Sequence, residues 1–299
     1  MDNLYGQGSS LPTITKERAV TDLDSKTMSK IFADGILDGR VVFVTGGGTG
    51  ITGGVARALA EAGANVALVS RSMEHLEPAA AAINQLRGSS PTAREGMDTG
   101  EAFAIAADVR KPEEVEQAIA ATIDRFGKID IVVNGAAGNF LCKAEELSSN
   151  GFGTVVDIDL KGTFNVCRAA FVQLKQHRGQ ILNISATLHY LGTPMQLHVS
   201  AAKAGVDALT RNLAVEWGRY GIRVNAIAPG PIGDTEGMKR LVPEPIKEKL
   251  QQRIPLGRFG LISDIENAAV FLCSDAASYI NGAVLVVDGG HWLAANRLL

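Results

Sequence analysis

Short apolar runs alternate with longer segments of helical periodicity along most of the chain. Runs such as 41–45 and 65–70 are rich in β-branched residues and bounded by glycine or polar residues, which is typical of buried parallel strands. The expected strands are 41–45, 65–70, 103–107, 129–134, 180–185, 222–228 and 283–288, and the expected helices are 52–62, 73–87, 112–126, 151–177, 200–219 and 263–274. This alternation predicts one α/β domain with a doubly wound parallel sheet and helices on both faces.

Three segments depart from this alternation. Residues 1–37 are polar, with scattered Gly, Ser, Thr and Asp, and predict a partly flexible N-terminal arm with a short helix over 22–35. The domain itself is expected over residues 38–299. Residues 88–100 are rich in turn-forming residues and predict a solvated loop, and residues 231–257 predict a loop with short helices.

The composition excludes several classes of protein. A chain of 299 residues, 46% of them hydrophobic, fits one α/β domain with a sizeable core. A net charge of -3 gives no reason to expect a nucleic-acid partner. No run of 18 apolar residues is present, so no membrane span is expected.

Cysteine usage and the chain ends bear on the compartment. Cys142, Cys167 and Cys273 lie far apart and form no CxxC pair, which favours a reducing compartment and predicts neither a disulfide framework nor a metal site. The N-terminus shows no signal-peptide pattern, and residues 296–299 differ from the serine-lysine-leucine peroxisomal address. We therefore expect a bacterial cytoplasm, with the peroxisome as the alternative.

A glycine-rich turn follows the first expected strand and opens a helix. Residues 45–52 read TGGGTGIT. Glycines at this position allow a tight turn, and they let backbone N–H groups and the positive end of the helix approach a pyrophosphate. In this strand–turn–helix context the sequence predicts a Rossmann-type site for a dinucleotide.

The end of the second expected strand indicates which dinucleotide binds. An NAD enzyme usually places an acidic residue there to bind the ribose 2′-hydroxyl. Here the strand ends at Ser70, and Arg71 follows at once. A small hydroxyl leaves room for a 2′-phosphate and a guanidinium binds phosphate well, so we predict NADP(H). A solvated surface arginine is the alternative for Arg71.

The glycine turn resembles the TGxxxGxG signature of the short-chain dehydrogenase/reductase family. Asp108-Val109, residues 134–138, Pro229 to Ile232 and residues 288–290 resemble further elements of that family in the same order. The resemblance implies cofactor contacts from Thr45, Gly46, Gly48, Thr49, Gly50, Ile51, Ser70, Arg71, Asp108, Val109, Asn134, Ala136, Ala137, Ile184, Lys203, Pro229, Gly230, Pro231 and Ile232. Thr52 replaces the last glycine of the signature, so we expect the turn to survive with a slightly displaced helix start.

The catalytic positions of the family have largely changed. Most members carry YxxxK, and Lys203 matches its lysine. Val199 stands at the tyrosine, Ala186 at the serine that precedes it, and Asp159 at the helix asparagine. A ketone reductase needs the tyrosine to protonate oxygen. A conjugated thioester takes its proton on carbon, and its oxygen needs only transient hydrogen-bond stabilisation.

Four blocks carry a narrower resemblance. Residues 134–140 (NGAAGNF), 157–164 (DIDLKGTF), 183–188 (NISATL) and 196–203 (QLHVSAAK) resemble the 2,4-dienoyl-CoA reductases, especially the peroxisomal type. That branch reduces 2,4-dienoyl-CoA to 3-enoyl-CoA with NADPH during β-oxidation of unsaturated fatty acids. The resemblance implies that Asp159 holds or protonates a water that protonates the α-carbon, and that Lys203 binds the nicotinamide ribose and supplies positive charge. Asn139 and Phe140 would lie along the acyl chain and thioester.

Several residues keep two interpretations. Asp159 is either the proton-handling residue or only an ion-pair partner of Lys203. His198 is a proton donor, a thioester contact or a core residue, Tyr190 is a substitute acid or a bystander, and Ser200 is a further candidate. Cys142 is expected to pack, and the basic residues near the substrate loops either meet CoA phosphates or are solvated; these are Lys239, Arg240, Arg253 and Arg258.

The function keeps two alternatives beside the dienoyl-CoA reductase. One is another short-chain reductase of a 3-oxoacyl thioester, an enoyl thioester or a ketone that uses Tyr190. The other is a catalytically inactive NADP-binding protein. By analogy with the family, helices 151–177 and 200–219 are expected to pair across a homodimer or homotetramer.

Overall fold

The computed structural model describes residues 31–86, 100–242 and 244–294. Seven parallel strands form one sheet in the order β3-β2-β1-β4-β5-β6-β7, which confirms the predicted doubly wound sheet. The strands are β1 (Val41–Thr45), β2 (Asn65–Ser70), β3 (Ala102–Ala106), β4 (Ile131–Asn134), β5 (Gln180–Ile184), β6 (Arg223–Pro229) and β7 (Val284–Val287). The strand order reverses between β1 and β4, so a crevice opens where these two strands end.

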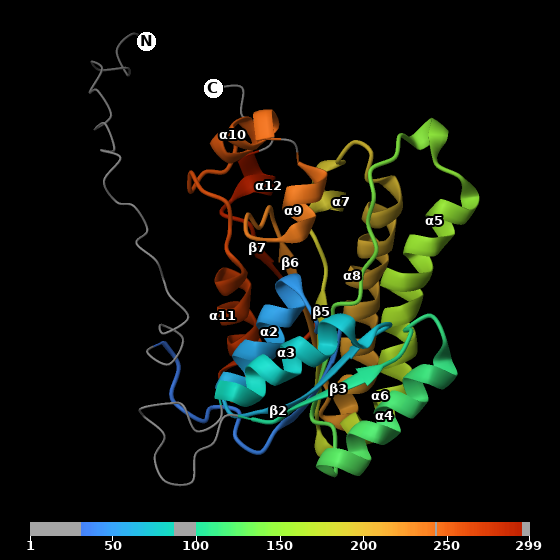
Figure 1. Cartoon of the computed structure of the whole chain (residues 1–299), viewed down its shortest axis with the longest axis vertical. Coiled ribbons are helices and arrows are strands. Elements are labelled where there is room, and N and C mark those ends of the chain that lie inside the picture. The colour runs from blue at the N-terminus through green and yellow to red at the C-terminus, as the bar shows by residue number, and fades with distance from the viewer. Residues whose placement is uncertain (1–30, 87–99, 243, 295–299) are drawn as a thin grey trace, which may run out of the picture.

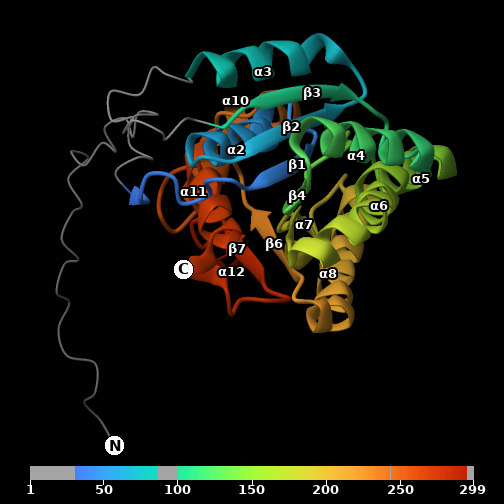
Figure 2. The ribbon, with the colours of Figure 1, turned by 90° about the horizontal axis from the view of Figure 1, so that it is seen from below.

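Helices cover both faces of the sheet, as Figure 2 shows. Helices α2 (Gly50–Glu61), α3 (Met73–Leu86) and α11 (Ile262–Cys273) pack on one face, and α4 (Pro112–Phe126), α6 (Gly162–His177) and α8 (Leu197–Trp217) pack on the other. Helix α5 (Ser149–Val156) lies beside α8. The short helices α7 (Leu188–Leu191), α9 (Glu236–Leu241), α10 (Glu244–Gln252) and α12 (His291–Ala294) gather at the top of Figure 1, beyond the ends of β5, β6 and β7.

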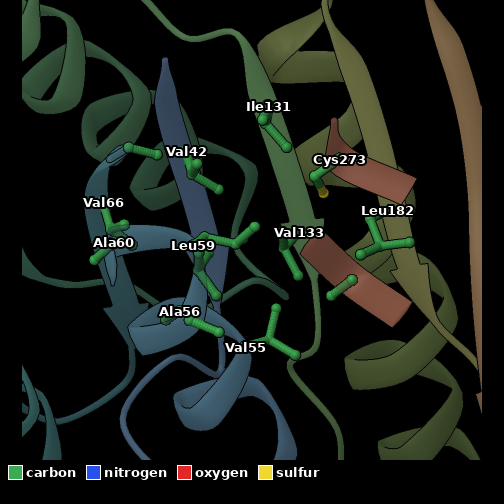
Figure 3. Packing of buried hydrophobic residues seen from close by; sticks show 14 of the residues in the cluster. Val42, Val55, Ala56, Leu59, Ala60, Val66, Ile131, Val133, Leu182 and Cys273 are labelled. Atoms are coloured by element: carbon green, nitrogen blue, oxygen red, sulfur yellow. The ribbon is translucent and has the colours of Figure 1, made fainter. Parts of the chain in front are cut away.

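The apolar strands fill two cores, one on each face of the sheet. On the first face, Val42, Val133 and Leu182 of the strands meet Leu59 of α2 and Cys273 of α11 (Figure 3). All five are nearly inaccessible to solvent. Because strands covered on both faces have no wet side, their sequences read as continuous apolar runs rather than as alternating ones.

Helix α4 shows how local sequence sets an element's ends. Pro112 opens it, where a missing N–H costs nothing, and Glu113 and Glu114 place negative charge in the first turn. Gly127 closes it in the left-handed conformation with φ 82°. The predicted bounds of this helix are confirmed because its start and stop signals are both local.

One predicted helix is wrong in its continuity. The segment predicted as a single helix over 151–177 consists of α5, a π-helical turn at Asp157–Lys161 and α6. A π turn inserts an extra residue into the helical repeat and rotates the side chains that follow it. The turn contains Asp159, which is completely buried.

The packed domain begins earlier than predicted. Leu37 is 2% exposed in the core, and Phe32 and Ile36 pack against it, although residue 38 was the expected boundary. Residues 34–39 form turns where the predicted 22–35 helix would end. Most of the predicted arm and nearly all of the predicted 88–100 loop lie outside the described residues.

The described residues contain neither a membrane-spanning helix nor a metal-binding cluster. No helix in these ranges is long and apolar enough to cross a membrane. No group of three or more His, Cys, Asp or Glu side chains in the same ranges is arranged to hold a metal ion.

Candidate cofactor and active site

The glycine turn forms a close-fitting cradle between β1 and α2. Gly46 has φ 72°, and a Cβ added there would lie 2.7 Å from the carbonyl oxygen of Gly135. Gly50 has φ 59° and opens α2. A Cβ on Gly48 would lie 3.1 Å from Cβ of His75. Side chains are therefore excluded from this turn by backbone conformation at Gly46 and Gly50 and by tight packing at Gly46 and Gly48.

A cavity of about 500 Å³ opens in front of this cradle. Its lining includes the predicted cofactor residues Gly46, Gly48, Thr49, Ser70, Arg71, Asp108, Val109, Ala136 and Ala137. The remaining predicted cofactor residues do not line it: Thr45, Gly50, Ile51, Asn134, Ile184, Lys203, Pro229, Gly230, Pro231 and Ile232. The open space thus follows the adenosine and pyrophosphate half of the predicted dinucleotide path, and its small, backbone-rich lining fits that group.

Hydroxyl groups and basic side chains line the end of the cavity where the ribose is expected. Ser70, Arg71, Ser72 and His75 line it together. Sequence reasoning missed Ser72 and His75, although their place in and just before the first turn of the helix after Arg71 was a local signal. No acidic side chain belongs to this group of four, so the lining suits a phosphate more than a bare hydroxyl.

Asp108, at the end of the cavity where the adenine is expected, is held by Arg110. Its carboxylate accepts bonds from Arg110 Nε at 2.9 and 3.0 Å, and Oδ1 also accepts the Arg110 backbone N–H at 3.0 Å. The bond from the Arg110 side chain is the main cause that lowers the pKa of Asp108 below its ordinary value, despite partial burial. Asp108 is therefore a rigid, ionised wall of the cavity.

Thr52, the departure from the glycine signature, is accommodated by a missing side chain opposite it. Thr52 is 5% exposed, and its Oγ1 donates to the carbonyl oxygen of Gly135 at 3.4 Å. A Cβ on Gly135 would lie 2.3 Å from that hydroxyl. The Thr52 side chain occupies the space that a side chain at position 135 would need. The predicted turn is therefore retained, with α2 beginning at Gly50.

Asp159 and Lys203 meet across two helices. Oδ2 of Asp159 lies 3.2 Å from Nζ of Lys203, and Oδ1 accepts the Gly138 backbone N–H at 2.7 Å. The ammonium of Lys203 donates a hydrogen bond to the Ile184 carbonyl oxygen at 2.8 Å. Oδ2 consequently has charge compensation but no aligned hydrogen-bond donor among the described residues. A buried carboxylate oxygen in this state can hold a water or a proton.

A buried valine, Val199, stands at the position of the family tyrosine. Val199 is 4% exposed and packs with Val155 and Ala202. Position 199 therefore supplies no hydroxyl. Asp159 and Lys203 form a buried titratable pair one helical turn from it.

His198 is completely buried and lies under Phe140. The two rings are 4.3 Å apart, and neither ring nitrogen of His198 has a hydrogen-bond partner among the described residues. Asn139 precedes Phe140 in the same segment, and the buried hydroxyl of Ser200 likewise lacks a partner within the described ranges. His198 and Ser200 both lie in the first turn of α8, and neither has a hydrogen bond to Asp159 or Lys203 among the described residues.

Tyr190 has a partner other than the substrate site. Its hydroxyl donates to Oδ2 of Asp207 at 2.8 Å. Burial, followed by the bond to Asp207, raises the pKa of Tyr190 well above its ordinary value. A phenol held in this way is a weak acid, which argues against the alternative that Tyr190 replaces the missing tyrosine.

The basic residues near the substrate loops are mostly engaged or solvated. Arg258 forms a two-pronged pair with Asp264 at 2.7 and 3.0 Å. Lys239 pairs with Glu236 at 2.7 Å and is 61% exposed. Arg253 is exposed, and the side chain of Arg240 lies outside the described residues. Among the described members of this set, Arg253 and Lys239 are the most exposed, and Lys239 shares its charge with Glu236.

The three cysteines differ in accessibility. Cys167 and Cys273 are buried, and burial raises the pKa of each thiol to about 12. Cys142 is half-buried, and its backbone N–H donates to the Met195 carbonyl oxygen at 3.1 Å. That bond ties the Phe140 segment to the residues just before α8.

Comparisons with known proteins place the chain. The family model described as enoyl-(acyl carrier protein) reductase matches residues 46–291. The peroxisomal 2,4-dienoyl-CoA reductase of Saccharomyces cerevisiae, named as (3E)-enoyl-CoA-producing, is 50% identical over 86% of this chain and 85% of its own length. The protein of the same name in Arabidopsis thaliana is 46% identical over 91% of each chain.

Solved structures agree with this placement. A short chain dehydrogenase from Bacillus anthracis is 41% identical, with a TM-score of 0.73 over 85% of this chain and 96% of that one. Matching sequence, strand order and glycine turn lead to one conclusion. The chain belongs to the short-chain dehydrogenase/reductase family.

Proposed function

We propose that this chain is an NADPH-dependent 2,4-dienoyl-CoA reductase that forms 3-enoyl-CoA in the β-oxidation of unsaturated fatty acids. The observation that carries the proposal is the buried pair of Asp159 and Lys203 at a site where the family tyrosine is replaced by Val199. Relatives that carry this activity in their names match most of the chain. Acyl-CoA is thus the substrate class.

The cofactor assignment rests on the ribose end of the cavity. Ser70, Arg71 and His75 would hold the 2′-phosphate, and the glycine turn would hold the pyrophosphate. NADPH, when bound, supplies the hydride that adds to the far end of the conjugated system. Lys203 would bind the nicotinamide ribose, and Pro229 to Ile232 would close over the nicotinamide.

Asp159 handles the proton in this proposal. Its Oδ1 is held by the Gly138 N–H, and Oδ2 is left to orient or protonate a water beside the substrate. The ammonium of Lys203 offsets negative charge that develops on the thioester oxygen. Asn139 and Phe140 border the acyl chain, and the proton goes to the α-carbon, so no phenol is needed on the carbonyl oxygen.

Three substrates test the activity. NADPH oxidation is measured with 2,4-hexadienoyl-CoA, crotonyl-CoA and acetoacetyl-CoA, and the product is identified by mass spectrometry and NMR. We expect turnover only with the dienoyl thioester, with the remaining double bond between the third and fourth carbons. Preference for acetoacetyl-CoA identifies a ketone reductase instead, preference for crotonyl-CoA another enoyl reductase, and tight NADPH binding without any turnover an inactive NADP-binding protein.

Assembly and compartment complete the proposal. Pairing of α5, α6 and α8 across a two-fold axis gives a homodimer or homotetramer, which analytical ultracentrifugation distinguishes from a monomer. The bacterial cytoplasm and the peroxisome are the two candidate compartments, and the relatives from Saccharomyces cerevisiae and Arabidopsis thaliana are named peroxisomal. Imaging of the tagged full chain in its own host separates the two compartments.

A further inference from the structure

We propose that Asp207 is a positioning residue that holds the end of β5 and helix α7 against α8 and thereby fixes the catalytic Lys203. The Asp207 network is defined as Asp207 with Ser185, His189 and Tyr190. The inference rests on the proposed role of Lys203 in binding the cofactor ribose. It concerns a buried carboxylate that the proton chemistry at Asp159 does not use.

The carboxylate of Asp207 is fully engaged by groups from a single neighbouring segment. Asp207 is 2% exposed on α8. Its Oδ1 accepts the Ser185 hydroxyl at 2.5 Å, and its Oδ2 accepts the Tyr190 hydroxyl at 2.8 Å and Nε2 of His189 at 2.9 Å. An ionised carboxylate only accepts hydrogen bonds, so each of these three partners acts as the donor.

Burying the Asp207 carboxylate disfavours folding, so its place in the core calls for a role that a neutral residue cannot fill. A carboxylate removed from water is unfavourable unless good hydrogen bonds replace its hydration. The only cation near it in the described structure is Arg211, whose Nη2 lies 3.9 Å from Oδ2 on the solvent side. Asparagine presents one acceptor oxygen rather than two, so it cannot replace aspartate as the receiver of all three donors.

The network and the Lys203 anchor connect the same two elements. Lys203 and Asp207 stand one helical turn apart on α8, so their side chains share a face. Lys203 donates to the carbonyl oxygen of Ile184, and Asp207 accepts from Ser185, the next residue. A shift of this strand end would therefore move the acceptor that orients the Lys203 ammonium.

Helix α7 depends on the same bonds. It spans only Leu188–Leu191, which is too short to be stable by itself. His189 and Tyr190 attach it to Asp207, and the Tyr190 ring lies 5.4 Å from the ring of Trp292 on α12. The network thus connects the catalytic helix to the C-terminal helix through α7.

Binding of NADPH to four variants tests the proposal without using any acyl-CoA. Wild type, Asp207→Asn, Lys203→Met and the double variant are titrated by nicotinamide fluorescence. We expect Asp207→Asn to raise the Kd for NADPH about 3- to 10-fold, since misplacing one contact group by a fraction of an ångström has effects of this order. In the Lys203→Met background the same substitution should change Kd less than about twofold, because residues that act through one another are non-additive.

Activity gives the second arm. Asp207→Asn should lower kcat about tenfold, whereas Tyr190→Phe, which removes one of three donors, should lower it less than about fivefold. Asp124→Asn on the exposed face of α4 is the matched control and should behave as wild type. Loss of kcat in Tyr190→Phe to the level of Asp159→Asn would mean that Tyr190 is an acid, and it would overturn the proposal.

A spectroscopic readout separates positioning from simple loss of stability. Trp217 and Trp292 are the two tryptophans of the chain, so Trp217→Phe leaves Trp292 as a reporter of α7. Asp207→Asn should shift its emission in the folded protein. Two results overturn the proposal. One is an unchanged Trp292 emission together with the same change in Kd in both Lys203 backgrounds. The other is a lower Tm of Asp207→Asn with wild-type kcat and Kd. If the wild-type protein binds no NADPH, the cofactor assignment is wrong, and this result is distinguishable from failure of the Asp207 proposal.

Discussion

The two halves of the sheet's carboxyl edge are built in opposite ways. Beyond β1 and β2 the lining consists of backbone, glycine and small polar side chains, and it leaves about 500 Å³ open. Beyond β5, buried side chains already hold one another: Asp159 faces Lys203, and Asp207 holds Ser185, His189 and Tyr190. The first half depends on the absence of side chains at its glycines. The second half depends on buried polar side chains that must be positioned correctly relative to one another.

This difference has a practical meaning. On the cofactor side, adding atoms is the damaging change, since the cradle around Gly46 and Gly135 has no spare volume. On the proposed catalytic side, removing a charge is the damaging change, since it leaves the buried partners of Asp159 or Asp207 without compensation. Four substitutions break or sharpen the contrast.

The largest effect is expected at Asp159. Asp159→Asn keeps an acceptor for the Gly138 N–H but removes the charge opposite Lys203, so kcat should fall at least about 100-fold, the range for losing a general acid–base group. The Kd for NADPH should stay near the wild-type value, because Lys203 keeps its separate bond to the Ile184 carbonyl oxygen. Steady-state kinetics and fluorescence titration measure both.

Asp157→Asn is the matched control on the same π turn. Its carboxylate is 50% exposed and lies 3.8 Å from Lys161, so its loss should not affect kcat. Wild-type turnover in Asp159→Asn would remove the proton role from Asp159.

The next effect is expected at Arg71. Arg71→Ser removes the guanidinium beside Ser70 and should lower the preference for NADPH over NADH about 10- to 100-fold, as for loss of a charged hydrogen bond. The ratio of kcat/KM for the two cofactors measures it. Arg168→Ser, on an exposed position of α6, should leave the ratio unchanged. An unaltered ratio in Arg71→Ser would make Arg71 a solvated surface residue.

A smaller effect is expected where Thr52 and Gly135 share volume. Gly135→Ala should weaken NADPH binding and lower the free energy of unfolding by about 1–3 kcal/mol, the usual cost of overpacking. Thr52→Gly together with Gly135→Ala should recover most of both, because the clash disappears. Chemical denaturation and cofactor titration of the double-mutant cycle check this. Additive losses would show that the two positions do not interact.

The smallest effect concerns pH and Asp108. Arg110 lowers the pKa of Asp108 in the folded state, so the stabilisation is fully present above the ordinary pKa of 3.8 and is lost as the pH falls through the lowered value. Asp108→Asn should therefore lose less stability than wild type on acidification below about pH 4, by under about 1 kcal/mol, since Arg110 is partly exposed. Urea unfolding across this range measures it, and parallel curves would contradict the prediction.

The predicted cofactor residues that line one cavity come from local sequence signals. Residues 45–50, Ser70 with Arg71, and Asp108 with Val109 each lie in a short contiguous segment that ends a strand, and the structure brings members of each to one cavity. A strand followed by a glycine turn and a helix leaves few alternatives for the backbone.

The catalytic half needed more than local signals. Resemblance selected Asp159 and Lys203, but neither periodicity nor composition predicts the π turn at Asp157–Lys161 that contains Asp159. No local sequence pattern marks Asp207 as buried. Its partners lie on a different element, and the sequence of a helix does not distinguish this aspartate from a solvent-exposed one. Tyr190 was considered as an acid since its bond to Asp207 forms only in the folded chain.

The contrast between the three thiols provides a labelling handle. At neutral pH the thiols of Cys167 and Cys273 stay protonated and enclosed, while Cys142 meets solvent two residues after Phe140. A maleimide dye should therefore attach at a single site on the unmodified protein. Because the Cys142 backbone N–H donates to the Met195 carbonyl oxygen, such a dye would report movement of the segment that packs on His198.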